Sequence, residues 1–356
     1  MNYKKYLIVI IGISVIIGGL CAINKSIYVS LFYYITNHEE TFLTRGDVLD
    51  LDLAPVHEVD VNYGDWLVHP CVRYIPDGIN GHKWWMAVTP YPNSDNMYEQ
   101  PILFCGEGND DFPPKKWNYV GFIAERHNSG YNADPNLFYA DAKLWIVWKE
   151  HETENTKRNC IMMRSYDGHS FSLPRKVLEE RDSIHVGLTA PVILEINDSI
   201  KLLATDFEHQ RNEEQHPFQP FGENTLAVWY LEGNDLENGF FKYQYSAKQD
   251  YPSGFNFWHA DMVKVSNKLY YSVVTPEKAN KILIGESNDG VHYKYWDKPL
   301  LSRNGNMLSN LYKTSLVAVD DNYYLFYPCL SSYFKFNKKS YIHCKAFKMQ
   351  DIFSKQ

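Results

Sequence analysis

Three acidic residues stand where strand-like stretches begin or end, and carboxylates in such places can do chemistry. Asp134 opens the stretch "ADPNLFY", Asp261 lies in "HADM", and Glu208 lies in "TDFEH". Cleavage of a bond between two sugars needs one carboxyl group as an acid and a second as a nucleophile or base. We therefore predict catalytic roles for these three residues. The alternative for each is a solvated or capping carboxylate in a turn.

Histidines form a second group of candidates. His69 and His259 both fall near the start of apolar strand-like stretches. A neutral imidazole can act as a general base, as a hydrogen-bond partner for a sugar or as a metal ligand, and the sequence leaves these roles open. The six cysteines form no CxxC pair and no metal-type spacing with histidine. We therefore expect neither a metal nor a cofactor, while a disulfide between Cys329 and Cys344 stays open.

Polar and aromatic residues accompany these candidates and suit a sugar, whose apolar face stacks on aromatic rings. Aromatic residues make up 15% of the chain, and its net charge of −8 argues against a nucleic-acid groove, which needs a basic face. Packing within their own loops is the alternative role for the aromatic side chains. The residues predicted to bind substrate are His69, Arg73, Tyr91, Tyr131, Thr189, Trp258 and His259.

A repeat organises the chain from residue 66 onward. Five units of strand, turn and aromatic-rich strand begin at residues 69, 134, 190, 260 and 314. Units of this length with four strands each are typical of propeller blades, which bury their faces against one another around an axis. We therefore predict an all-β, five-bladed β-propeller, with first strands beginning near 70, 135, 190, 260 and 314. The alternating segment at 47–61 is expected to complete the last blade.

The motifs of the repeat resemble those of a known group. The stretches "ADPNLFY" and "LTAPVIL", the turns "SYDGHSF" and "SNDGVHY" and the five-unit layout are similar to the five-bladed glycoside hydrolases of families 43 and 32 and their relatives, over residues 66–350. The resemblance implies a central funnel with two Asp and one Glu from different blades. This chain has Asp134 at one matching position, but His69 and Thr189 at the other two.

The resemblance leaves two classes of function open. One is a glycoside hydrolase-like enzyme that cleaves or modifies a glycan in the funnel with a nonstandard acid pair. The other is a non-catalytic propeller that binds glycans or scaffolds other proteins. In both, Asp134 is expected at the funnel mouth with its carboxylate exposed, and Pro135 predicts an extended backbone at the residue before it.

The N-terminus predicts a membrane attachment. Residues 6–23 contain no charge, are nearly long enough to cross a bilayer as a helix, and follow Lys4 and Lys5. We predict a cytoplasmic N-terminus at 1–5, a transmembrane signal-anchor at 6–23, a connector at 24–65 and an extracytoplasmic propeller at 66–356. A cleaved signal peptide and a lipoprotein signal ending at Cys21 are the alternatives. The expected partners are a glycan and the membrane, without nucleic acid.

Overall fold

The computed structural model describes residues 40–43, 49–54, 56–58, 66–92, 95–126, 129–152, 159–179, 188–206, 225–252, 255, 257–276, 280–302, 311–329 and 341–354. The predicted signal-anchor at 6–23 and Glu208 lie outside these ranges. Within them, no helix has both the length and the apolar character needed to cross a membrane.

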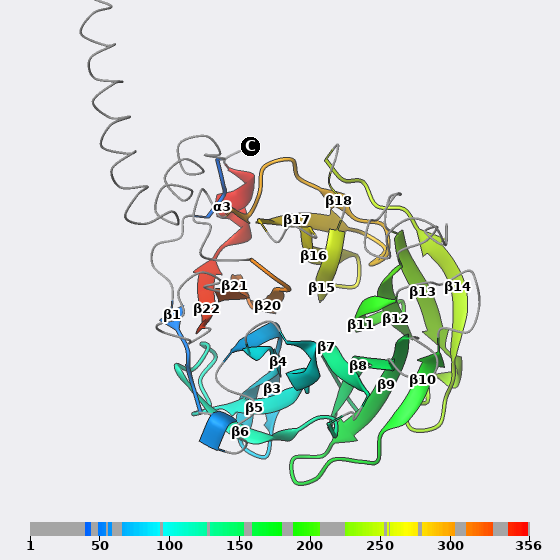
Figure 1. The fold of residues 1–356 in the computed structure, drawn as a ribbon. Helices are drawn as coiled ribbons and strands as arrows, with labels where there is room; N and C mark the ends of the chain where they lie inside the picture. The colour runs from blue at the N-terminus through cyan, green and yellow to red at the C-terminus, as the bar shows by residue number, and fades with distance from the viewer. Residues whose placement is uncertain are drawn as a thin grey trace, which may run out of the picture.

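The described strands form five antiparallel sheets arranged as blades around an axis (Figure 1). Blade one contains β3 (Leu67–Ile79), β4 (His82–Pro90), β5 (Ile102–Gly106) and β6 (Lys116–Phe122). Blade two contains β7 (Gly130–Ala140), β8 (Lys143–Glu152), β9 (Asn159–Tyr166) and β10 (Arg175–Glu179). Blade three contains β11 (Thr189–Ile196), β12 (Ser199–Asp206), β13 (Thr225–Leu231) and β14 (Phe241–Ala247).

Blades four and five complete the ring. Blade four contains β15 (Phe257–Ser266), β16 (Leu269–Pro276), β17 (Lys281–Ser287) and β18 (Lys294–Tyr295), with β19 (Leu301–Ser302) paired to β17. Blade five contains β20 (Ser315–Val319), β21 (Asn322–Cys329) and β22 (Tyr341–Phe347). The first strand of every blade lies next to the axis and begins close to its predicted position, so the five-bladed propeller is confirmed (Figure 1).

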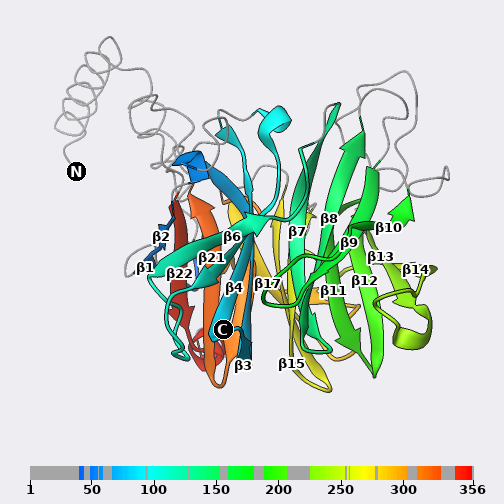
Figure 2. The same cartoon turned by 90° about the horizontal axis from the view of Figure 1, so that it is seen from below.

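The N-terminal segment closes the ring, as the alternating pattern at 47–61 predicts. Strand β1 (Leu49–Asp50) pairs antiparallel with β22 and becomes the outer strand of blade five. The next strand, β2 (Asp52–Leu53), pairs parallel with β6 at the outer edge of blade one. Residues 49–53 therefore join the last blade to the first. Figure 2 shows this segment beside β22 and β6 at one side of the ring.

The short helices lie outside the blades' sheets. The described residues include the 3-10 turns η1 (Val56–Glu58), η3 (Asn96–Tyr98) and η4 (Glu232–Asn234), and α3 (Met349–Phe353) follows β22. Helix α3 packs two buried side chains, Met349 and Ile352, on the core between blades four and five. Helix α3 is therefore packed against the ring.

The core is divided among the interfaces between neighbouring blades. Each of five clusters of buried apolar residues draws its members from two adjacent blades. Strand β4 shows the cause, because neighbouring residues of a strand point to opposite faces. Trp84 contacts Phe326 of blade five, whereas Trp85 contacts Tyr166 of blade two. A blade buries both of its faces only when it lies between two other blades. Its strands therefore carry apolar residues on both faces instead of alternating polar and apolar residues, and this pattern recurs in each blade.

Local signals in the sequence account for the turns. Asp167 accepts hydrogen bonds from the backbone N–H groups of His169 and Ser170, and Asp289 accepts them from Val291 and His292. Asp-Gly favours this geometry because the glycine takes a positive φ, +97° at Gly168 and +74° at Gly290.

The disulfide left open by the sequence does not form. Cys344 is a free, buried thiol, and β21 pairs it with Phe326, while Cys329 lies opposite Tyr341.

Candidate metal centre

The inner strands of blades one, two and three begin with the same backbone irregularity. His69, Asp134 and Ala190 have positive φ values of 55°, 55° and 48°, and each precedes a proline. The pairing with the second strand shifts at each of these points, which marks a β-bulge. The extended backbone predicted for Asp134 from Pro135 is therefore wrong. Left-handed conformations cost a residue with a side chain about 1 kcal/mol, and such strain gathers at functional sites.

Three of the predicted site residues meet at these blade entrances. Asp134 Oδ1 lies 3.5 Å from His69 Nδ1 and 3.3 Å from His259 Nε2. One ligand atom from each residue lies within 4.8 Å of the other two. The side chains come from β3, β7 and β15, and at most 3% of each residue is exposed. Asp134 therefore lies at a blade entrance, but its carboxylate is buried and not exposed as predicted.

The surroundings set the protonation states of the three groups. Burial lowers the pKa of His69 well below the ordinary imidazole value and also lowers the pKa of His259, although the Asp134 carboxylate opposes both changes. Burial opposes ionisation of Asp134, yet His69, Lys149 and His259 hold the pKa of its carboxyl well below its usual value. The cluster thus presents a carboxylate beside two imidazoles whose pKa values are lowered by burial.

This cluster is suited to a metal ion. Within the described part of the chain, both ring nitrogens of His69 and Oδ1 of Asp134 are buried without a hydrogen bond of regular geometry, an arrangement that is costly unless another ligand satisfies them. Two imidazole nitrogens and one carboxylate oxygen are a common ligand set for Zn²⁺, Fe²⁺ and similar ions. The sequence predicted no metal because these residues lie far apart in the chain and match no local ligand motif.

The second oxygen of Asp134 is held by other groups. Thr189 Oγ1 donates a hydrogen bond to Asp134 Oδ2 at 2.7 Å, and Lys149 Nζ lies 3.4 Å from the same oxygen. Lys149 also donates to Thr189 Oγ1 at 3.3 Å. Only Oδ1 is therefore free to bind a metal. Thr189, which stands where the resembling hydrolases carry Glu, orients the carboxylate here, and no sequence motif points to Lys149.

Aromatic rings fix the two imidazoles. Tyr312 stacks on His69 with 4.9 Å between ring centroids and meets His259 edge-on at 4.7 Å. Trp258 lies 6.0 Å from His259, also between centroids. No sequence pattern identifies Tyr312 as a site residue.

Further polar and aromatic groups surround Lys149. Its ammonium lies over the ring of Tyr131 at 5.3 Å from the centroid, and Tyr131 contacts His151. Burial raises the pKa of Glu99 to about 8, an effect that Lys149 opposes and Asp134 reinforces. Burial and the nearby Glu99 also raise the pKa of Tyr91. The predicted residues Tyr91 and Tyr131 thus lie near the cluster, together with Glu99, which sequence reasoning missed.

Asp261 and Arg73 are close to each other but belong to a different set of contacts. Arg73 Nη2 donates to Asp261 Oδ1 at 2.8 Å, and Asp261 is completely buried. Neither residue belongs to the group of potential metal ligands. The catalytic roles predicted for Asp261 and Glu208 stay predictions.

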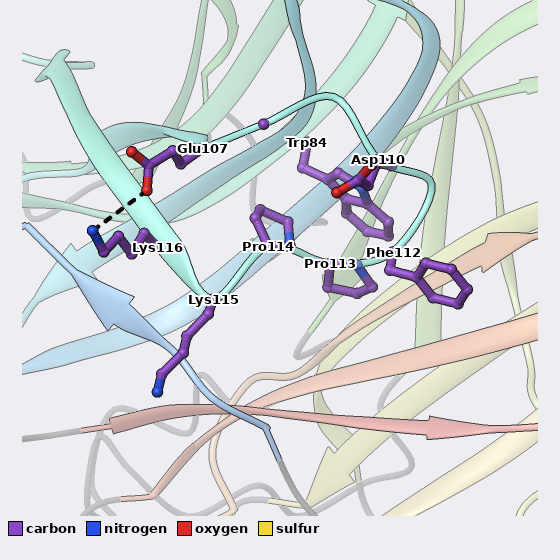
Figure 3. A pocket seen from close by; sticks show the side chains of 9 residues that line it. Trp84, Glu107, Asp110, Phe112, Pro113, Pro114, Lys115 and Lys116 are labelled. Carbon is purple, nitrogen blue, oxygen red and sulfur yellow. Dashed lines mark hydrogen bonds and ion pairs between the residues drawn. The ribbon is translucent and has the colours of Figure 1, made fainter.

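A surface pocket on blade one is separate from this cluster. It encloses about 440 Å³ beside the β5–β6 connection and is lined in part by Trp84, Phe112 and Pro114 (Figure 3). Lys116 pairs with Glu107 at 3.7 Å on its wall. Because this connection follows the end of β5, it lies at the end of the sheet opposite to the start of β3, which carries His69.

Comparisons with known proteins identify the fold. No protein-family profile matches the chain, and no curated protein matches its sequence. Solved structures do match it. An N-acetylgalactosamine deacetylase from F. plautii in complex with blood group B trisaccharide has a TM-score of 0.62 at 14% identity, over 87% of this chain and 94% of the deacetylase. The GH43_1 enzyme from Xanthomonas citri complexed with xylose has a TM-score of 0.57 at 11% identity, over 89% and 92% of the two chains.

A levansucrase mutant from B. megaterium extends the comparison, with a TM-score of 0.56 at 10% identity over 79% of this chain and 82% of the levansucrase. The fold is that of the five-bladed propeller glycoside hydrolases. The predicted resemblance in fold is thus confirmed.

Proposed function

We propose that this protein is a metal-dependent hydrolase that removes an acyl group from a sugar of a glycan. The observation that carries the proposal is the buried cluster of His69, Asp134 and His259, whose ligand atoms lie within 4.8 Å of one another. A metal held there would polarise an acyl carbonyl and lower the pKa of a bound water. Hydrolysis of an amide or ester on a sugar can proceed by this chemistry, and it needs no pair of carboxyl groups on the two sides of a glycosidic bond.

Cleavage of the glycosidic bond itself fits the site less well. It requires a pair of carboxyl groups, one on each side of the bond. The groups closest to Asp134 are instead two histidines, a threonine and a lysine, and the Asp261 carboxylate is already bound by Arg73. The solved deacetylase with the same fold acts on an N-acetylated sugar according to its name, which supports the same class of reaction here.

Residues beside the cluster supply the other parts of such a site. His69 and Lys149 together hold the pKa of the Asp134 carboxyl low, and Lys149 lies beside Oδ2, whereas Oδ1 is directed at the histidines. We assign proton transfer to the leaving group to Glu99, which is buried near Lys149 and Asp134 and whose raised pKa of about 8 suits proton transfer near neutral pH. Tyr91 and Tyr131 offer aromatic faces on which a sugar ring can stack.

The experiment tests whether the reaction requires a metal and which product it releases. The purified protein is treated with EDTA, dialysed, and supplied with Zn²⁺, Co²⁺ or Mn²⁺ on a panel of acetylated glycans that includes N-acetylgalactosamine-containing oligosaccharides. We expect release of acetate that requires metal and leaves the glycosidic bonds intact, as seen by mass spectrometry. His69→Ala and His259→Ala should lose this activity, whereas Lys242→Ala, whose side chain forms an exposed ion pair with Glu232, should keep it.

Other products would redirect the assignment. Release of free monosaccharides without metal would support a glycoside hydrolase. Binding of glycans without any product would support a non-catalytic binding propeller.

We further propose that residues 6–23 anchor the protein in a membrane and that the propeller lies on the extracytoplasmic side. The uncharged run after Lys4 and Lys5 supports both statements. The full-length protein should stay in the membrane fraction after carbonate washing, and protease added outside intact cells should digest the propeller. A mature soluble form that begins near residue 24 would show a cleaved signal peptide instead.

A further inference from the structure

A second set of buried polar groups lies along the axis, with Asp261 at its centre. Arg73 donates from Nη2 to Asp261 Oδ1 at 2.8 Å and from Nη1 to Oδ2 at 3.1 Å. Asn136 Nδ2 donates to Oδ1 at 3.2 Å. Ser315 Oγ donates to Oδ2 at 2.6 Å, and the backbone N–H of Leu316 donates to it at 3.1 Å. Every hydrogen bond of this carboxylate thus comes from another blade.

These contacts reach the inner strands of all five blades. Arg73 lies on β3, Asn136 on β7, Asp261 on β15 and Ser315 on β20. The remaining blade joins through the backbone N–H of Ile193 on β11, which donates to Asn136 Oδ1 at 3.2 Å. Among the described strands, no backbone ladder pairs the inner strand of one blade with that of another. Side chains must therefore set their relative positions, and we call Arg73, Asn136, Asp261 and Ser315 the axial layer.

Three members of the axial layer lie on the strands that carry the potential metal ligands, whereas Ser315 lies on β20. Asn136 follows Asp134 on β7, and Asp261 follows His259 on β15. Arg73 lies downstream of His69 on β3. A shift of one strand along the axis would therefore displace its ligand and its member of the axial layer together.

We propose that the axial layer positions the three strands that carry the metal ligands, and that Asp261 is a positioning residue. This inference rests on the proposed metal centre. The bulges at His69 and Asp134 hold strained backbone that must be fixed by its surroundings, and the hydrogen bonds of the axial layer begin within a few residues of both bulges. The Arg73 side chain also contacts the backbone of β7, because its Nε donates to Leu137 O at 2.8 Å.

The contacts of Asp261 agree with a structural role, because both oxygens of its buried carboxylate already accept hydrogen bonds from Arg73, Asn136 and Ser315. Removing a buried charge also leaves its partner unpaired, so the test needs a mild variant beside the direct one.

The experiment measures Co²⁺ binding by the EDTA-treated protein, through calorimetry and the visible absorption of the bound ion. We expect Asp261→Asn and the milder Ser315→Ala to weaken Co²⁺ binding about 10-fold or more and to change the absorption spectrum, because both loosen the ligand strands. Thermal unfolding identifies which variants are folded. If Asp261→Asn does not fold, Ser315→Ala decides the outcome.

Tyr295→Phe is the matched control. It removes a buried hydrogen bond to Ser272 Oγ, 2.9 Å long, within blade four and outside the axial layer. This variant should lose stability but keep the affinity for Co²⁺ and the spectrum. Folded axial-layer variants that bind Co²⁺ like the wild type would overturn the positioning role alone. A wild-type protein that binds no Co²⁺ would overturn the metal centre and the positioning role with it.

Discussion

Asp134 contacts four side chains through its two oxygens. Oδ1 lies between the imidazoles of His69 and His259, whereas Oδ2 accepts from Thr189 and faces the ammonium of Lys149. Taken alone, the sequence suggests that replacing Asp134 by Asn would leave thermal stability unchanged, since shape is preserved. The contact with Lys149 argues otherwise, because the ammonium is buried and its pKa is raised by this carboxylate against the effect of burial.

We therefore predict that Asp134→Asn loses both metal binding and stability. Removing one member of a buried ion pair costs about 3 kcal/mol or more, because the other charge stays behind unpaired. Scanning calorimetry should show a clear fall in Tm. The double variant Asp134→Asn/Lys149→Met removes both charges, so its Tm should return most of the way while metal binding stays lost.

Two observations would contradict this reading of Asp134. An Asp134→Asn variant with wild-type Tm would show that Lys149 does not depend on the carboxylate. Retention of Co²⁺ binding in the double variant would remove Asp134 from the ligand set.

At the scale of elements, the sequence predicts the blades well because their signals are local. The apolar inner strands recur once per unit, and Asp167 and Asp289 mark the same turn in two of the units, so the number of blades and the start of each follow from the pattern. Closure of the ring by residues 49–53 is also predictable, since the last unit lacks a fourth strand and the only unassigned alternating segment precedes the first.

The backbone at the blade entrances is a different case. A residue before proline usually avoids helical conformations, yet His69, Asp134 and Ala190 all adopt positive φ. Packing between blades overrides the local preference there. The metal centre could not be predicted for a related reason. Its three ligands are brought together only when the ring closes, and the sequence around any one of them does not indicate the other two.

For the whole molecule, a metal at this centre would cross-link blades one, two and four, because His69, Asp134 and His259 come from β3, β7 and β15. An unfolded chain has no such preformed site, so binding energy adds to the free energy of unfolding. At a free metal concentration about 100 times Kd, the gain is about 2.7 kcal/mol.

We therefore expect Zn²⁺ or Co²⁺ to raise the Tm of the EDTA-treated wild type by about 5 °C, given the usual relation between free energy and Tm for a domain of this size. His259→Ala keeps the fold of blade four but lacks one ligand, so the same metal concentration should leave its Tm almost unchanged. The unfolding transition should stay single in both proteins, since each core cluster joins two blades and no blade can unfold alone. An equal rise in Tm for the wild type and His259→Ala would show that the metal binds elsewhere on the propeller. The catalytic site proposed at the axis would then be wrong.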